Sequence, residues 1–92
     1  MSSEPNLVKE EVQNLQRMIK MEDKMAKALQ TAMEECMNHY AQTYLRAIPK
    51  AVQQFGMQGL ITQIRYALSN MQTWRGPSAR ETKKVLRKFI GE

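Results

Sequence analysis

The amino-acid sequence predicts an all-α fold, namely a small four- or five-helix bundle with a long N-terminal helix. Apolar residues recur at spacings of three and four along most of the chain, which is the period of an α-helix. No stretch shows the apolar–polar alternation of a strand, and Pro and Gly fall between the periodic segments. The 92 residues suit a single helical domain over residues 1–92, with a flexible lead at 1–5.

The N-terminal half contains the longest helical pattern. Its first apolar stripe has spacings of four, three and four residues and consists of Val8, Val12, Leu15 and Ile19. The stripe is interrupted near 21–23, resumes at Met25 and continues to Tyr44. Either one helix covers residues 5–47 or a break near 21–23 gives two. The lack of Gly or Pro in this stretch favours one long or bent helix.

Proline and glycine define the elements in the middle of the chain. Pro49 ends the first element, because the residue before a proline is disfavoured in helical geometry. Pro49 also suits the first turn of a short helix through Phe55, with Gly56 as its C-terminal cap and a tight joint at 56–59. The next helix has the clearest apolar face in the sequence, formed by Met57, Leu60, Ile61, Ile64, Ala67, Leu68 and Met71.

The C-terminal segment begins with a turn at 74–77 and continues as a helix over 79–90. Ser78 and Glu81 have the spacing of a capping box, in which two side chains satisfy free backbone N–H groups at the start of a helix. The apolar side of this helix consists of Val85, Leu86, Phe89 and Ile90. Its other side is cationic and consists of Arg80, Lys83, Lys84, Arg87 and Lys88.

Charge is distributed unevenly along the chain. Residues 1–45 have a net charge of −2, whereas residues 46–92 have a net charge of +7, and no acidic residue lies between Glu35 and Glu81. A basic half of this kind suits a polyanion or an acidic protein surface as a partner. The alternative is that the Lys and Arg residues are solvated and have no partner.

The sequence offers little for catalysis, and we expect no enzyme activity, no catalytic residues and no cofactor. It has no Gly-rich phosphate loop, no nucleophile elbow and no zinc-protease motif, and it contains one Asp and one His. Cys36 and His39 have a spacing that places two ligands on one helical face, but a zinc site needs three or four. We therefore expect no metal site, and a buried Cys beside a polar His instead.

Cations lie next to aromatic rings at three places in the sequence, at 44–46, 65–66 and 74–75. Guanidinium groups bind phosphates and exposed rings stack on bases, so these pairs and the last helix predict contact with a nucleic acid or an acidic partner. The expected contact residues are Arg46, Lys50, Arg65, Trp74, Arg75, Arg80, Lys83, Lys84, Arg87 and Lys88. The alternative is that the aromatic rings are core anchors, an alternative that fits Phe89 best and Trp74 least.

Methionine is unusually frequent, with eight residues in the chain. Its flexible side chain suits adaptable protein-binding surfaces, so Met18, Met21 and Met25 are expected to contact a protein. The alternative is that the methionines fill gaps in a small core.

The compartment can also be predicted from composition. Residues 1–6 are polar and no long apolar run follows, so neither a signal peptide nor a membrane span is expected. Cys36 is the sole cysteine and fits a reducing compartment. The expected localisation is cytoplasmic, with association with the nucleoid as an option and no membrane partner.

Residues 40–71 resemble the small helical subunit of type III CRISPR RNA-guided effector complexes. The features that match are an aromatic-led helix from Tyr44, the apolar-proline step Ile48-Pro49, and Gly56-Met57 before an amphipathic helix. That family has Gly-Leu where this chain has Gly56-Met57, and the chain is short for the family. The resemblance implies a non-catalytic subunit that lines a nucleic-acid channel through basic residues such as Arg46, Lys50 and Arg65.

Three hypotheses of function remain open at the level of sequence. The first is a non-enzymatic accessory subunit of a nucleic-acid-processing complex (a polymerase, a nuclease or an RNA-guided effector). Such a subunit would contact DNA or RNA without sequence specificity, a larger protein, or both. The second is a pure protein-interaction module that docks through Met and aromatic side chains. The third is a self-associating structural protein, and therefore a homo-oligomer.

Overall fold

The computed structural model describes residues 7–92, and all regular secondary structure in that range is helical. The helices are α1 (Leu7–Met18), α2 (Asp23–Glu35), α3 (His39–Arg46), α4 (Ile48–Phe55), α5 (Met57–Leu68) and α6 (Pro77–Phe89). Only Ala47 separates α3 from α4, so the bundle has five helices when these two are counted as one bent helix. The prediction of a small all-α bundle is confirmed, whereas the lead predicted for residues 1–5 lies outside the described residues.

The prediction of one helix over residues 5–47 is wrong, because the chain turns twice within this range. The first turn, between α1 and α2, lies at the break that the sequence offered as an alternative near 21–23. There Met21 is buried, and the amide nitrogen of Gln16 donates hydrogen bonds to the Met21 carbonyl oxygen (3.2 Å) and to Asp23 Oδ1 (2.9 Å). Burial of Met21 and these bonds stabilise a turn that contains neither Gly nor Pro.

The second turn, at residues 36–38, separates α2 from α3 and was not predicted. The Asn38 side chain caps α3 by accepting a hydrogen bond of 2.9 Å from the backbone N–H of Ala41. The amide nitrogen of Gln42 donates to three carbonyl oxygens at the end of α2, those of Ala32, Met33 and Cys36. These caps satisfy backbone groups that a continuous helix would have paired internally.

The elements around Pro49 and Gly56 agree with the sequence prediction. Pro49 lies in the first turn of α4, and Gly56 ends this helix with a φ of 62°. α4 then packs closely on α5, because Gly59 lies directly against the backbone carbonyl of Ala51. A Cβ atom at residue 59 would overlap this carbonyl, so the absence of a side chain at Gly59 permits the close approach.

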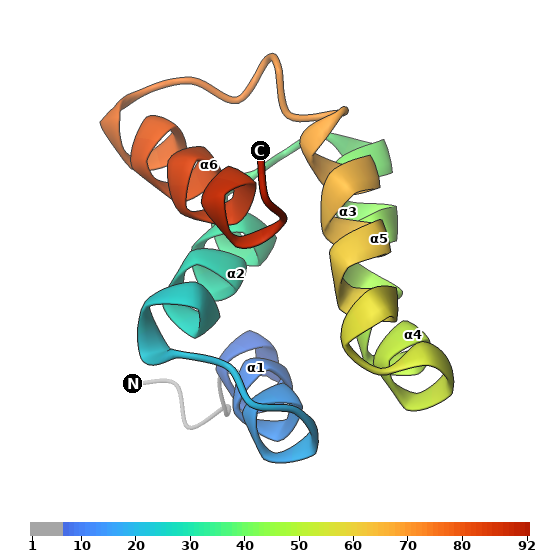
Figure 1. The fold of residues 1–92 in the computed structure, drawn as a ribbon. Helices are drawn as coiled ribbons and strands as arrows, with labels where there is room; N and C mark the ends of the chain where they lie inside the picture. Colours follow the sequence, from blue (N-terminus) through green and yellow to red (C-terminus); the bar gives the residue numbers. More distant parts are fainter. Residues whose placement is uncertain (1–6) are drawn as a thin grey trace.

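The helices pack as two groups around one core (Figure 1). α2 packs against α6, and α1 packs against α2, while α3 and α4 pack against α5. The largest fully buried side chains come from every helix and from two connections, and are Leu15, Leu29, Cys36, Leu45, Ile48, Leu60, Ile64, Met71 and Leu86. None of the helices formed by residues 7–92 is long and apolar enough to cross a membrane.

The start of α6 differs from the prediction. The helix begins at Pro77 after Gly76, whose φ of 115° is accessible to glycine but strained for other residues. Ser78 and Glu81 therefore do not form the predicted capping box. Instead, the Ser78 hydroxyl donates a hydrogen bond of 2.9 Å to Oε1 of Glu35 at the end of α2. This bond joins the end of α2 to the first turn of α6.

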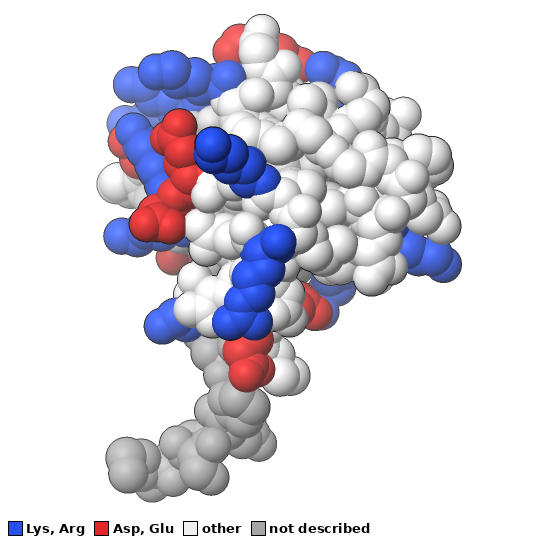
Figure 2. Space-filling view, turned by 60° about the horizontal axis from the view of Figure 1, so that its bottom comes forward, with Lys and Arg blue, Asp and Glu red and all other residues white. Residues whose placement is uncertain are grey.

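Charged side chains are unevenly distributed over the folded molecule. In the view of Figure 2, Lys, Arg, Asp and Glu gather over one half, and a broad expanse of the other half is uncharged. Helices α3, α4 and α5 contain few charged side chains. These are Arg46, Lys50 and Arg65, and α3 also begins with His39. The candidate charged surfaces therefore lie mainly around α2 and α6.

Candidate nucleic-acid interface

The cations of α6 do not form one row. They line two separate surface hollows. Residues 80, 83 and 87 lie along one stripe of the helix, and residues 84 and 88 lie along the next stripe. The first, here called the arginine hollow, has a volume of about 280 Å³ and is lined by Arg75, Gly76, Arg80, Lys83 and Arg87. The second, here called the lysine-rimmed groove, has a volume of about 710 Å³ and is lined by Lys20, Met21, Glu22, Lys24, Met25, Glu81, Lys84, Val85, Lys88 and Phe89.

The arginine hollow contains cations but no carboxylate among its lining residues. Arg75, Arg80 and Arg87 are exposed, and within residues 7–92 their guanidinium groups form no ion pair. Each guanidinium presents a planar set of N–H donors that matches two oxygens of a phosphate. Gly76 contributes no side chain, and the N-terminal end of α6 adds a partial positive charge beside it.

Lys83 differs from the arginines of this hollow because its ammonium group has protein partners. Nζ donates hydrogen bonds to the carbonyl oxygens of Met71 (3.0 Å) and Trp74 (2.6 Å), which belong to the connection between α5 and α6. Lys83 is also partly buried. It therefore contributes positive charge to the hollow but primarily holds the connection against α6.

The other predicted contact residues do not line the arginine hollow. Arg46 and Lys50 are exposed on α3 and α4, whereas Arg65 on α5 forms an ion pair with Glu92 (Nε to Oε2, 3.5 Å). Trp74 is partly buried and packs against the core. The sequence grouped these residues with the cations of α6, and the structure does not bring them into the same hollow.

Two of the aromatic residues noted in the sequence meet across helices. The rings of Tyr44 on α3 and Tyr66 on α5 lie with their centroids 5.3 Å apart, a tilted ring contact. Tyr66 is 49% exposed and Tyr40, one turn before Tyr44, is 65% exposed. Tyr40 and Tyr66 are therefore exposed rings on α3 and α5, whereas Tyr44 is partly buried and packs against the core.

The methionines predicted to contact a protein are mostly part of the core. Met21 and Met25 are buried, so the gap-filling alternative describes them better, whereas Met18 is 43% exposed. Met21 and Met25 nevertheless line the lysine-rimmed groove. Met21 and Met25 thus belong to the core and also form part of the floor of the groove.

Cys36 and His39 do not share a helical face. Cys36 is buried at the end of α2, and His39 is exposed as the first residue of α3, beyond the turn. Among the described residues, no group of three or more His, Cys, Asp or Glu side chains is placed to hold a metal ion.

Comparisons with known protein families, with curated proteins and with solved structures return no match for this chain. The geometry of the two hollows is therefore the basis for any assignment. The lysine-rimmed groove as a unit was missed by reasoning from sequence. Its two walls come from residues 20–25 and 81–89, and nothing in the sequence indicates that these segments lie side by side.

Proposed function

We propose that this chain is a non-enzymatic accessory protein of a nucleic-acid machine and that the arginine hollow contacts backbone phosphates of DNA or RNA. The observation that carries the proposal is that the guanidinium groups of Arg75, Arg80 and Arg87 form no ion pair within residues 7–92 and surround a hollow whose lining contains no carboxylate. A hollow of about 280 Å³ has room for one phosphate and its flanking sugar atoms.

The expected binding is independent of nucleotide sequence. Contacts from Arg and Lys to phosphate oxygens position a protein on a nucleic acid, whereas sequence is read by contacts to base edges. The hollow offers guanidinium and ammonium groups alone, which bind phosphates and can read only guanine among the bases, and it has no Asn, Gln, Asp or Glu side chain to read the others. The affinity should therefore depend strongly on salt and weakly on sequence.

The resemblance of residues 40–71 to the small subunit of type III effector complexes supports the same class of function through a different surface. It assigns the contact to Arg46, Lys50 and Arg65. Of these, Arg46 and Lys50 are better candidates, because the ion pair with Glu92 already satisfies part of the Arg65 guanidinium. The exposed rings of Tyr40 and Tyr66 would supply stacking for single-stranded bases next to such a contact.

Fluorescence anisotropy with labelled single- and double-stranded oligonucleotides tests the proposal. The protein should bind at low salt with similar affinity for unrelated sequences. The logarithm of the association constant should fall linearly with the logarithm of the salt concentration, with a slope of about −2 to −3 for three phosphate contacts. Failure to bind either kind of oligonucleotide at low salt would overturn it.

A further inference from the structure

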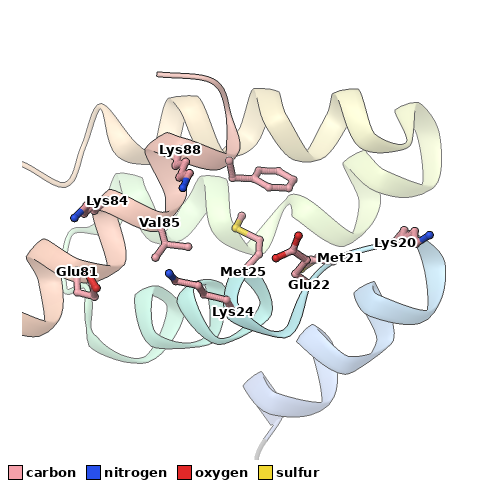
Figure 3. A pocket seen from close by; sticks show the side chains of 10 residues that line it. Lys20, Met21, Glu22, Lys24, Met25, Glu81, Lys84, Val85 and Lys88 are labelled. Carbon is pink, nitrogen blue, oxygen red and sulfur yellow. The ribbon is translucent and has the colours of Figure 1, made fainter.

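We propose that the lysine-rimmed groove binds an acidic amphipathic helix of a partner protein. The groove lies between the start of α2, with the connection before it, and the C-terminal half of α6 (Figure 3). It is separate from the arginine hollow, with which it shares no lining residue. The proposal names a protein partner and does not rest on nucleic-acid binding.

The floor of the groove is apolar. Met25 of α2 and Val85 of α6 point into the same space in Figure 3, and Met21 and Phe89 complete the floor. Val85 and Phe89 are only partly buried, so part of their apolar surface remains in contact with water. Burial of this surface by a ligand would contribute favourable hydrophobic free energy to binding. The flexible Met side chains can also adjust to the shape of an incoming side chain.

The rim of the groove carries lysines on both walls. Lys20 and Lys24 flank it on the α2 side, and Lys84 and Lys88 flank it on the α6 side. All four are exposed, and none forms an ion pair within the part of the chain that the structure describes. Glu22 and Glu81 also line the groove, which leaves its lining with a net positive charge.

This arrangement matches one class of ligand. An amphipathic helix places apolar side chains along one stripe and can carry acidic side chains on both flanks of it. Its apolar stripe would cover the floor formed by Met21, Met25, Val85 and Phe89, while its carboxylates would meet a lysine on either wall. The volume of about 710 Å³ accommodates a few large side chains, which suits anchor residues on such a helix.

A nucleic acid fits the groove poorly. Its phosphates gain nothing from an apolar floor. The groove also contains no arginine, the residue whose planar group binds phosphate oxygens in pairs. The two hollows therefore suit different partners.

The test uses a synthetic labelled helical peptide with Leu at positions i, i+3, i+4 and i+7 and Glu on both flanks of this stripe. A scrambled peptide of the same composition serves as the peptide control. NMR follows the methyl signals of Met21, Met25 and Val85, and anisotropy gives the affinity. We expect the amphipathic peptide to shift these signals in a saturable manner and the scrambled peptide to bind far more weakly.

The variant Lys84→Glu/Lys88→Glu should weaken peptide binding about fivefold or more, as expected for losing two exposed ion pairs. Arg80→Glu/Arg87→Glu makes the same change of charge on the same helix and should leave the affinity within about twofold. Lys20→Glu/Lys24→Glu tests the opposite wall should the first variant fail to fold. Because peptide binding needs no nucleic acid, this experiment and the oligonucleotide titration can fail separately.

Four results would overturn the proposal. The first is that the methyl signals do not move, and the second is that the scrambled peptide binds equally well, which would indicate attraction of charge alone. The third is that an oligonucleotide displaces the peptide and shifts the same signals. The fourth is that light scattering shows a dimer that Lys84→Glu/Lys88→Glu abolishes, which would identify a second copy of the chain as the occupant.

Discussion

Nζ of Lys83 lies 2.6 Å from the carbonyl oxygen of Trp74, across nine residues of the chain. The same atom donates a second hydrogen bond to the carbonyl oxygen of Met71, so one lysine joins α6 to the α5–α6 connection at two points. Its neighbours in the arginine hollow, Arg80 and Arg87, have no such partner within residues 7–92. Residues that look equivalent in sequence thus have different roles in the fold.

This difference predicts how two substitutions on α6 affect stability. Lys83→Met leaves the carbonyls of Met71 and Trp74 without their charged donor and should lower the free energy of unfolding by about 2 kcal/mol. Arg87→Met, on the exposed stripe, should change it by less than about 0.5 kcal/mol. Urea unfolding followed by circular dichroism measures both. Equal effects of the two substitutions would show that the Lys83 bonds do not stabilise the fold.

The Gln42 side chain stabilises the end of α2 at the turn between α2 and α3. The Gln42 amide nitrogen donates to the carbonyl oxygens of Ala32, Met33 and Cys36, whereas its Oε1 atom is buried and has no partner among the described residues. Gln42→Ala removes the donor and should destabilise the protein by about 1–3 kcal/mol, that is, lower the melting temperature by several degrees. Gln53→Ala, an exposed glutamine on α4, is the control. A melting temperature of Gln42→Ala equal to that of the control would contradict this account.

The contact between α4 and α5 predicts a large effect at Gly59. A Cβ atom there would overlap the carbonyl group of Ala51, which is backbone and cannot rotate away. We expect Gly59→Ala to force the helices apart and to destabilise the protein by about 1–3 kcal/mol. This cost should exceed the gain in helix propensity from replacing Gly with Ala. Gln58→Ala, the preceding exposed position, should be close to neutral. Calorimetric melting distinguishes them, and a stabilised Gly59→Ala protein would be the opposite of the expected result.

The sequence predicted those parts of the fold that depend on local signals. Helical periodicity gave the all-α class, and Pro49 and Gly56 gave the boundaries of α4 and the start of α5. The turn at 36–38 could not be predicted in this way, because Gln42 reaches back ten residues to satisfy the end of α2. Ser78 formed no capping box, because α6 begins earlier, at Pro77 after the N-cap Gly76, and the Ser78 hydroxyl donates to Glu35 instead.

The candidate site was predicted in its residue types but not in its arrangement. The sequence identified all four cations of the arginine hollow, since Arg75, Arg80, Lys83 and Arg87 are close together in the chain. Helical spacing places Lys84 and Lys88 on a separate stripe, but the sequence could not show that this stripe forms a groove, because the groove depends on which part of α2 lies beside α6. The role of Lys83 was missed for the same reason, since its acceptors lie on a connection without regular structure.

The surface implied by the resemblance can be tested beside the arginine hollow. Arg46→Gln/Lys50→Gln should leave oligonucleotide binding nearly unchanged if the arginine hollow makes the main contact, because neither residue lines it. A loss of binding in this variant alone would instead place the contact on α3 and α4. Anisotropy titrations at one low salt concentration are sufficient for the comparison.

The most direct test of the central proposal is the salt dependence of oligonucleotide binding in two charge-matched variants. Arg75→Gln/Arg80→Gln/Arg87→Gln removes the guanidinium groups of the arginine hollow, and Lys24→Gln/Lys84→Gln/Lys88→Gln removes the same charge from the groove. We predict that the slope of log association constant against log salt concentration becomes shallower by about 2–3 in the arginine variant alone. Equal loss in both variants, or an unchanged slope in the arginine variant, would contradict the assignment of phosphate binding to the arginine hollow.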